Sequence, residues 1–181
     1  LNHDNTLETG GSVAWSKQVG NFQALVNLEA RPNYENRDNR EVRLGPDNEV
    51  VGTLFETNIR DQQENTLSSN MSYSLGDHRM QLNALIREGD HPRPVRRDFV
   101  DFTDAGLVNR IEEEDVNREE SNWEVGGDYE FSFDDGSRLS VLFVANNEIR
   151  NNVRERYSAN PAEEGLSKNL FIDSRQERQE F

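Results

Sequence analysis

Residues 122–145, NWEVGGDYEFSFDDGSRLSVLFVA, carry the clearest structural pattern of the sequence. Apolar side chains recur at alternate positions before and after the centre of this stretch, which is the period of a β-strand with one apolar face. The centre itself, DDGS at 134–137, is made of residues that accept the left-handed backbone of a tight hairpin turn. The stretch therefore predicts a β-hairpin on which Trp123, Tyr129 and Phe143 share one face.

The same hairpin pattern recurs with a period of about 58 residues. Tight-turn signals lie at 20–21, 76–78 and 134–137, and looser turn signals lie between them at 45–48, 103–106 and 160–165. Alternating apolar residues flank each tight turn, and the intervening positions are mostly Ser, Asn, Gln, Glu and Arg. The sequence thus predicts an all-β fold, an antiparallel up-and-down meander of long hairpins with about six to seven strands over residues 1–181.

The apolar pattern ends about ten residues from each tight turn, and beyond that point the chain becomes charged. Each arm, from a tight turn to a loose one, is about 26 to 32 residues long, far longer than most strands of soluble sheets. Three long polar loops are therefore expected, at about 31–65, 88–121 and 148–167. Pro32, Pro92 and Pro94 are the expected breaks, because proline is poorly tolerated inside a paired strand.

The composition limits the possible classes of protein. The 181 residues carry a net charge of -15, only 33% of them are hydrophobic, and the mean hydropathy is -0.95. No apolar run is long enough for a transmembrane helix, and the lack of cysteine excludes disulfides and thiol chemistry. A pI near 4.6 argues against nucleic acid as a partner, because phosphate binding needs a basic surface.

The sequence contains no catalytic or cofactor motif, so we expect neither an enzyme nor a metal or cofactor site. It has no nucleophile elbow, phosphate-binding loop or dinucleotide fingerprint. The three histidines are dispersed along the chain and form no metal-ligand pair. The acidic run at 112–115 lacks the spacing of a calcium-binding loop, and we interpret it as a solvated face.

Each hairpin has a short turn at one end, a long polar excursion at the other, and an apolar band between them. A transmembrane β-barrel has this plan, with short periplasmic turns, long extracellular loops, a lipid-facing band about 25 Å tall and a wet interior. Aromatic residues belong near the membrane interfaces, and Phe22, Tyr73 and Phe131 lie beside the tight turns while Trp123 lies near the opposite limit of the band. The meander is therefore expected to be part of a large transmembrane β-barrel.

These segments resemble the β-barrel portion of TonB-dependent outer-membrane receptors. The resemblance rests on residues 122–133, on RLSVLFVA at 138–145 and on the long polar loops, and it covers the whole chain as a general pattern without a signature motif. It implies a location in the bacterial outer membrane, contact with outer-membrane lipid, and import of a small-molecule ligand such as a siderophore. It also implies a partner, the inner-membrane energy-coupling complex, which is reached through a plug domain not present in this sequence.

The number of arms indicates an incomplete barrel. Two arms flank each tight turn and a seventh begins near Ser167, whereas bacterial barrels close with an even number of strands. We therefore expect residues 1–181 to be a segment of a larger barrel. Two alternatives remain open: another large outer-membrane channel, such as a porin-like pore, or a soluble extracellular β-rich binding or adhesion module whose apolar faces meet another sheet.

Arginines recur beyond the apolar band on the arms that leave each tight turn. They lie about 16 to 20 residues past the turn, and therefore at similar heights. Arginines around a barrel mouth would gather an anionic ligand, although pairing with neighbouring Glu and Asp is the simpler interpretation. The candidate ligand-binding residues are Arg37, Arg40, Arg93, Arg96, Arg97, Arg154 and Arg156.

Overall fold

Glycines with a left-handed backbone form three tight turns of the chain. Gly20, Gly76 and Gly136 have φ angles of 57°, 56° and 82°, a region where a residue without a Cβ is unstrained. The computed structural model describes residues 9–159 and 165–181, and in it each of these turns joins two antiparallel strands. The turns lie where the sequence carries its tight-turn signals, because hairpin turns are specified by a few local residues.

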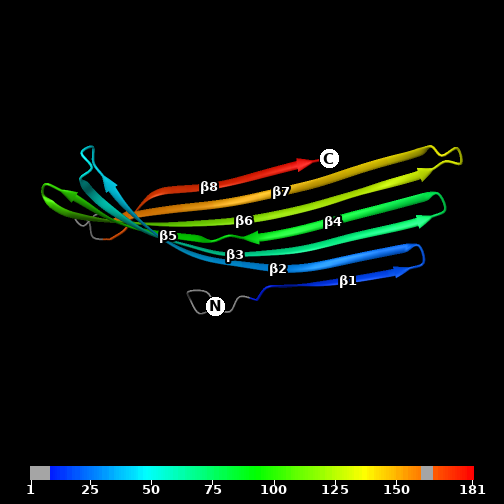
Figure 1. Cartoon of the computed structure of the whole chain (residues 1–181), viewed down its shortest axis with the longest axis horizontal. Coiled ribbons are helices and arrows are strands. Elements are labelled where there is room, and N and C mark those ends of the chain that lie inside the picture. The colour runs from blue at the N-terminus through cyan, green and yellow to red at the C-terminus, as the bar shows by residue number, and fades with distance from the viewer. Residues whose placement is uncertain (1–8, 160–164) are drawn as a thin grey trace.

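All strands of the described residues are antiparallel and belong to one sheet (Figure 1). They are β1 (Gly11–Val19), β2 (Phe22–Leu44), β3 (Val50–Leu75), β4 (His78–Asp90), β5 (Arg93–Thr103), β6 (Gly106–Ser132), β7 (Arg138–Ala159) and β8 (Ser167–Glu180). Hydrogen-bonded neighbours follow the order β1-β2-β3-β4-β6-β7-β8, and β5 lies between β3 and β6. The prediction of an all-β, antiparallel fold is confirmed.

Strands β4 and β5 form one arm with a short interruption at His91 and Pro92. The backbone N–H of His91 still donates to the carbonyl of Arg118 at 2.8 Å, and the N–H of Asp61 donates to the carbonyl of Pro92 at 3.3 Å. The pairing with β3 and with β6 keeps the same register on both sides of the interruption. The eight strands therefore make seven arms.

The stretches expected to be long polar loops, 31–65, 88–121 and 148–167, are mostly strand in the structure. Strands β2, β3, β6 and β7 are 23, 26, 27 and 22 residues long. β2 pairs with β3, β6 pairs with β7, and the combined arm of β4 and β5 pairs with β3 and β6, so backbone groups far from the tight turns still find partners. Polar side chains are stable there because the faces are uncovered. Residues 160–164, which hold most of the loose turn expected at 160–165, lie outside the described residues.

The three prolines interrupt the sheet less than expected. Pro32 lies within β2, and the described pairing of β1 with β2 extends only to Ala30. Among the described strands β2 therefore pairs only with β3 at Pro32, where the missing N–H of proline is tolerated. Pro94 is the second residue of β5, where one ladder hydrogen bond can be lost. Only Pro92 coincides with a break.

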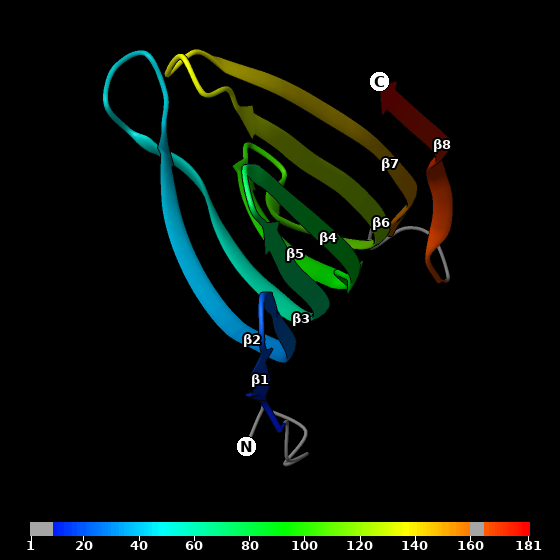
Figure 2. The same cartoon turned by 90° about the vertical axis from the view of Figure 1, so that its right-hand side faces the viewer.

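The sheet is a single bowed layer that curves into an open arc when it is viewed along the strands (Figures 1 and 2). Every contact between elements of the described chain joins hydrogen-bonded neighbours, so nothing packs on either face. Ala24 and Val95 are its buried apolar residues. Among residues 9–159 and 165–181, no helix has the length and hydropathy to cross a membrane.

Candidate functional site

The strand register places the large apolar side chains that surround the tight turns on one face, here called the apolar face. One row across four strands consists of Leu28, Leu67, Ile86 and Trp123. The apolar band on this face comprises Val13, Trp15, Val19, Phe22, Ala24, Val26, Leu28, Leu67, Met71, Tyr73, Leu75, Met80, Leu82, Ala84, Ile86, Trp123, Val125, Tyr129, Phe131, Leu139, Val141 and Phe143. Trp15 is 54% exposed and Leu28 is 57% exposed, so the band is uncovered within the described chain.

Aromatic rings make the band continuous near the turns. A Cβ added to Gly127 would lie 2.7 Å from a ring carbon of Phe143, so that ring covers the glycine of the neighbouring strand. The rings of His78 and Phe131 lie 4.8 Å apart, and the Tyr129 hydroxyl is 2.7 Å from His78 Nδ1. A shallow apolar hollow of about 400 Å³ lies between Phe22, Met71, Tyr73, Met80, Leu82, Tyr129, Val141 and Phe143.

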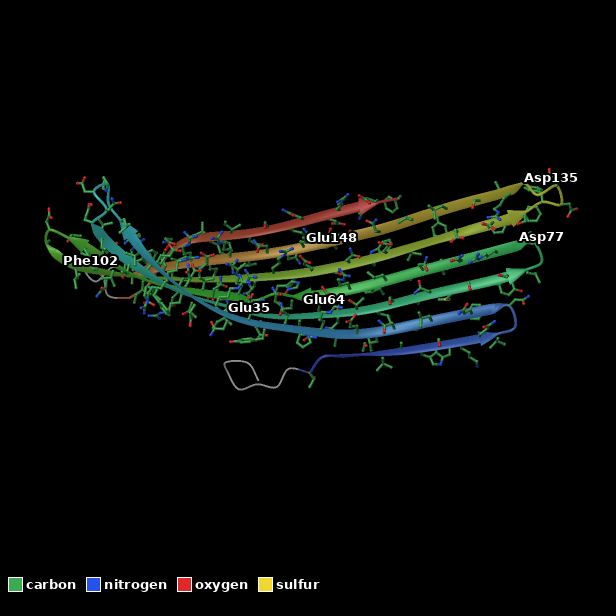
Figure 3. All side chains as sticks on the ribbon, viewed as in Figure 1. Glu35, Glu64, Asp77, Phe102, Asp135 and Glu148 are labelled. Atoms are coloured by element: carbon green, nitrogen blue, oxygen red, sulfur yellow. The ribbon has the colours of Figure 1, made fainter. Side chains whose placement is uncertain are left out.

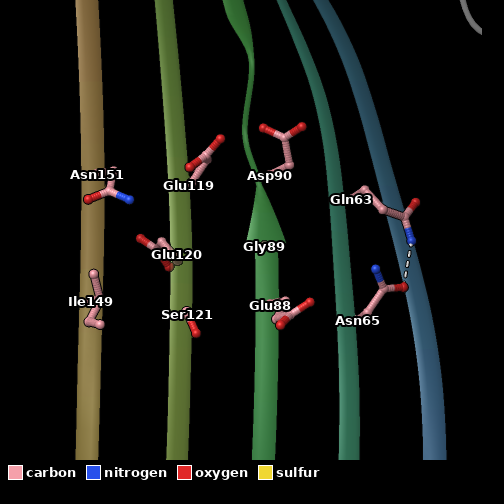
Figure 4. A pocket seen from close by; sticks show the side chains of 10 residues that line it. All are labelled: Gln63, Asn65, Glu88, Gly89, Asp90, Glu119, Glu120, Ser121, Ile149 and Asn151. Carbon is pink, nitrogen blue, oxygen red and sulfur yellow. Dashed lines mark hydrogen bonds between the residues drawn. The ribbon is translucent and has the colours of Figure 1, made fainter.

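A second, polar hollow of about 360 Å³ lies on the same face, immediately beyond the band (Figure 4). Side chains of β3, β4, β6 and β7 line it, and they include the carboxylates of Glu88, Asp90 and Glu119. The Gln63 amide donates to Asn65 Oδ1 at 3.1 Å along one side. No group of three or more His, Asp or Glu in the described part of the chain is placed to hold a metal ion.

The opposite face, here called the polar face, carries mainly Ser, Asn, Gln and charged side chains behind the apolar band. Arg138 Nη1 donates to Glu130 Oε2 at 3.3 Å across β6 and β7. Leu25, Leu85, Leu142 and Val144 are exceptions, and Leu142 is 75% exposed. Figure 3 shows side chains standing on the ribbon throughout, with Asp77 and Asp135 at the tight-turn end and Phe102 at the other.

Charge is divided between the two faces beyond the apolar band. All arginines except Arg40, Arg96 and Arg175 project from the polar face, because they occupy alternate positions in register across the sheet. The arginine belt, as we call one set of them, consists of Arg37, Arg60, Arg93, Arg97, Arg118, Arg154 and Arg156, with Glu35, Glu56, Glu112 and Glu114 interspersed. At the same height the apolar face carries Asp38, Asp61, Glu113, Asp115, Glu155 and Asp173, with Arg96 and Lys168 as cations.

Glu114 is the centre of the arginine belt, and it is only 5% exposed. Its carboxylate lies 2.8 Å from Arg154 Nε, 3.0 Å from Arg156 Nε and 3.2 Å from Arg97 Nη1. Burial opposes ionisation, but the contacts with these three guanidinium groups outweigh it and lower the pKa of Glu114 to about 2. Glu114 is therefore an anion at any physiological pH.

The remaining members of the belt surround this centre. Arg97 Nε also donates to Glu56 Oε2 at 2.7 Å, and Arg93 Nε donates to Asn58 Oδ1 at 3.1 Å. Asn58 is 7% exposed, and Val95, which occupies the same row as Asn58 and Glu114, is 3% exposed. The most buried side chains of this half of the sheet thus lie beneath the arginines.

The structure divides the candidate arginines between the two faces. Arg93, Arg97, Arg154 and Arg156 gather around Glu114 on the polar face, and Arg37 lies on the same face with its Nε 2.6 Å from Glu35. Arg96 projects from the opposite face and pairs with Glu113 at 2.9 Å and with Asp98 at 3.2 Å. Arg40 also projects from the apolar face, and no described residue forms an ion pair with it. The seven residues therefore do not form one ring.

Glu114 itself is not among the sequence-based candidates, because it lies within an acidic run interpreted as a solvated face. The strand divides that run, so that Glu112 and Glu114 lie on the polar face while Glu113 and Asp115 lie on the other. The sequence spacing does indicate which residues share a face: Arg154 and Arg156, like Glu112 and Glu114, are two residues apart and therefore project from the same side of their strand. The partners that Arg154 and Arg156 meet on the neighbouring strand depend on the strand register, and the sequence spacing does not specify that register.

Comparison with known proteins adds no assignment. No family model matches the sequence, and no curated protein matches it. The two unlike faces of the sheet are therefore the features from which a function can be inferred.

Proposed function

We propose that this chain is a segment of the wall of a large transmembrane β-barrel in the bacterial outer membrane, in a receptor of the TonB-dependent type that imports a siderophore or another large solute. The observation that carries the proposal is the uncovered apolar band. From Trp123 to Phe131 the band covers nine residues of β6, or about 26 Å along the strand at about 3.3 Å per residue. A tilted transmembrane β-strand needs about nine to eleven residues, so the band has the length that such a strand requires.

The aromatic residues at the two limits of the apolar band also support a membrane location and indicate how the strands are oriented in the membrane. Tyr73, Tyr129 and Phe131 lie next to the tight turns, and Trp123 lies at the other limit, as aromatic residues do at the two interfaces of a membrane. In this orientation the tight turns face the periplasm. The long charged halves of β2, β3, β6 and β7 extend above the outer surface, where they would meet a solute first.

The polar face would line the lumen of the barrel. It carries Ser68, Asn70, Gln81 and Asp128 behind the apolar band, which suits water and would be wasted in the core of a soluble sandwich. The remaining strands and the plug would come from the rest of the receptor, and the plug would reach the inner-membrane energy-coupling complex. A soluble binding or adhesion module would instead need a second layer over the band, and the described residues supply none.

The proposal can be tested with neighbouring positions on one strand. These 181 residues contain no cysteine, so cysteines introduced at Leu82 and at Gln81, on opposite faces of β4, can each be labelled with a fluorophore in the full-length protein after any cysteines elsewhere are replaced by serine. In vesicles made with brominated lipid, we expect strong quenching at position 82 and little at position 81. Equal quenching at the two positions, or none at either, would refute a lipid-facing band.

A further inference from the structure

The arginine belt has more positive charge than its own carboxylates neutralise. Around its centre, Arg93, Arg97, Arg154 and Arg156 form ion pairs with only two described carboxylates, Glu56 and Glu114. Glu112, beside Arg97 on the same face, adds one more negative charge. Carboxylates are available nearby, but Glu113 and Asp115 project from the other face of the same strand. The excess is therefore fixed by the strand register and concentrated on the face that would line the lumen.

The contacts around Glu114 leave part of each guanidinium group free. Arg154 and Arg156 approach Glu114 through Nε, and Arg93 approaches Asn58 through Nε. No described residue accepts a hydrogen bond from the terminal nitrogens of these three side chains. The side chains of Arg154 and Arg156 are 35% and 30% exposed, so their free ends reach the surface while Glu114 beneath them is buried.

The spacing of the three arginines suits a ligand with more than one negative group. Arg93 and Arg154 flank Val116 in one row, so they are separated by two strand spacings, or about 10 Å between backbones. Arg156 lies two residues from Arg154 on the same face, about 7 Å away along β7. Guanidinium groups bind planar carboxylate and phosphate groups through paired N–H donors, which makes them specific for such oxyanions.

We propose that Arg93, Arg154 and Arg156 form a binding site for a small molecule that bears at least two carboxylate or phosphate groups. Glu114 and Asn58 are positioning residues that hold the Nε atoms and direct the terminal nitrogens outward. The inference rests on the proposed function in placing the site within a lumen, and it narrows the imported solute to a multiply charged oxyanion.

The test measures binding of citrate and, separately, of pyrophosphate to the full-length protein in detergent by titration calorimetry. The double variant R154Q/R156Q should bind the preferred probe at least about tenfold more weakly, because two charge-assisted contacts are lost. R96Q is the matched control, since Arg96 lies at the same height on the opposite face, and its affinity should stay within about twofold of the wild type. The probe that binds with the higher affinity, citrate or pyrophosphate, identifies the charged groups of the ligand as carboxylates or phosphates.

Two further variants keep the test decisive. R154K/R156K retains the charge but not the paired donors, so it should bind more weakly than the wild type, and wild-type affinity in this variant would contradict a site built on guanidinium groups. If the double glutamine variant does not fold, R93Q gives the same test, because the Arg93 side chain forms no ion pair and hydrogen-bonds only to Asn58 among the described residues. Absence of binding by the wild type, or equal losses in R96Q and R154Q/R156Q, would overturn the inference. If the protein binds neither probe but shows the expected quenching at position 82, the binding site is refuted while the proposed location in the membrane stands.

Discussion

A single carboxylate holds three guanidinium groups together where β5, β6 and β7 lie side by side. Removing the charge of Glu114 would leave Arg97, Arg154 and Arg156 close to one another without their shared partner. We expect E114Q to destabilise the folded chain by about 2 to 3 kcal/mol, measured by urea unfolding of the protein in detergent. E112Q is the control, because Glu112 lies on the same face of β6 and has no ion pair within the described residues; its effect should stay below about 0.5 kcal/mol.

The contribution of Glu114 to the free energy of unfolding depends on pH. The pKa of Glu114 is lowered from an ordinary value of 4.5 to about 2, so its contribution to stability is complete above pH 4.5 and is lost as the pH falls toward 2. Over that range the wild type should lose about 3 kcal/mol that E114Q does not lose. The difference between the two proteins should therefore shrink in acid, and two unfolding curves that stay parallel from pH 5 to pH 2 would contradict the assignment.

At the scale of elements, the pairing of β6 with β7 depends on a glycine. A Cβ at Gly127 would lie 2.7 Å from both the Phe143 ring and the backbone oxygen of Gln81, and the backbone oxygen cannot move without disturbing β4. We expect G127A to destabilise the sheet by about 1 to 3 kcal/mol, seen as a lower midpoint of thermal unfolding in detergent. At Gly126 the nearest atoms are 3.4 Å and 3.6 Å away, so G126A should be tolerated, and equal effects of the two variants would contradict this packing.

The tight turns and the apolar halves of the strands could be predicted from the sequence, whereas the polar outer halves of the strands could not. The tight turns and the alternation around them are local, so the turn at Gly136 and the shared face of Trp123 and Tyr129 follow from a few neighbouring residues. The outer halves of the strands carry polar residues on both faces, so their sequences lack the alternation of apolar and polar residues that marks a strand. Such a sequence resembles that of a loop. The segment from 106 to 121 in β6 is of this kind, and only its pairing partners make it a strand.

The cluster around Glu114 could not be predicted for a different reason. Glu114 and Arg156 are 42 residues apart in sequence, and Arg97 comes from a third strand. Their meeting requires the strand order and the register of two pairings, and a one-residue slip of either would place Glu113 or Asp115 there instead. Similar height along a strand does not specify a face, which is why Arg40 and Arg96 lie on the opposite face from the other candidate arginines.

At the scale of the whole molecule, the described sheet has two unpaired edges, on β1 and on β8, together with its uncovered apolar band. The chain expressed by itself without detergent should therefore form large assemblies through strand addition and apolar contact. Size-exclusion chromatography should show these assemblies shifting to a narrow peak when detergent is added above its micelle concentration. A monodisperse, compact monomer without detergent would contradict both the free edges and the exposed band.

The division of charge between the two faces gives this sheet an electric field across its thickness. Only one layer of backbone separates the guanidinium groups of the arginine belt from the carboxylates of Asp38, Asp61, Glu113 and Asp115. At this height the polar face is therefore the more positive side of the sheet, and the apolar face is the more negative side. An anion is repelled on the apolar side and attracted on the polar side, so anions would concentrate over the arginine belt before they touch any specific residue.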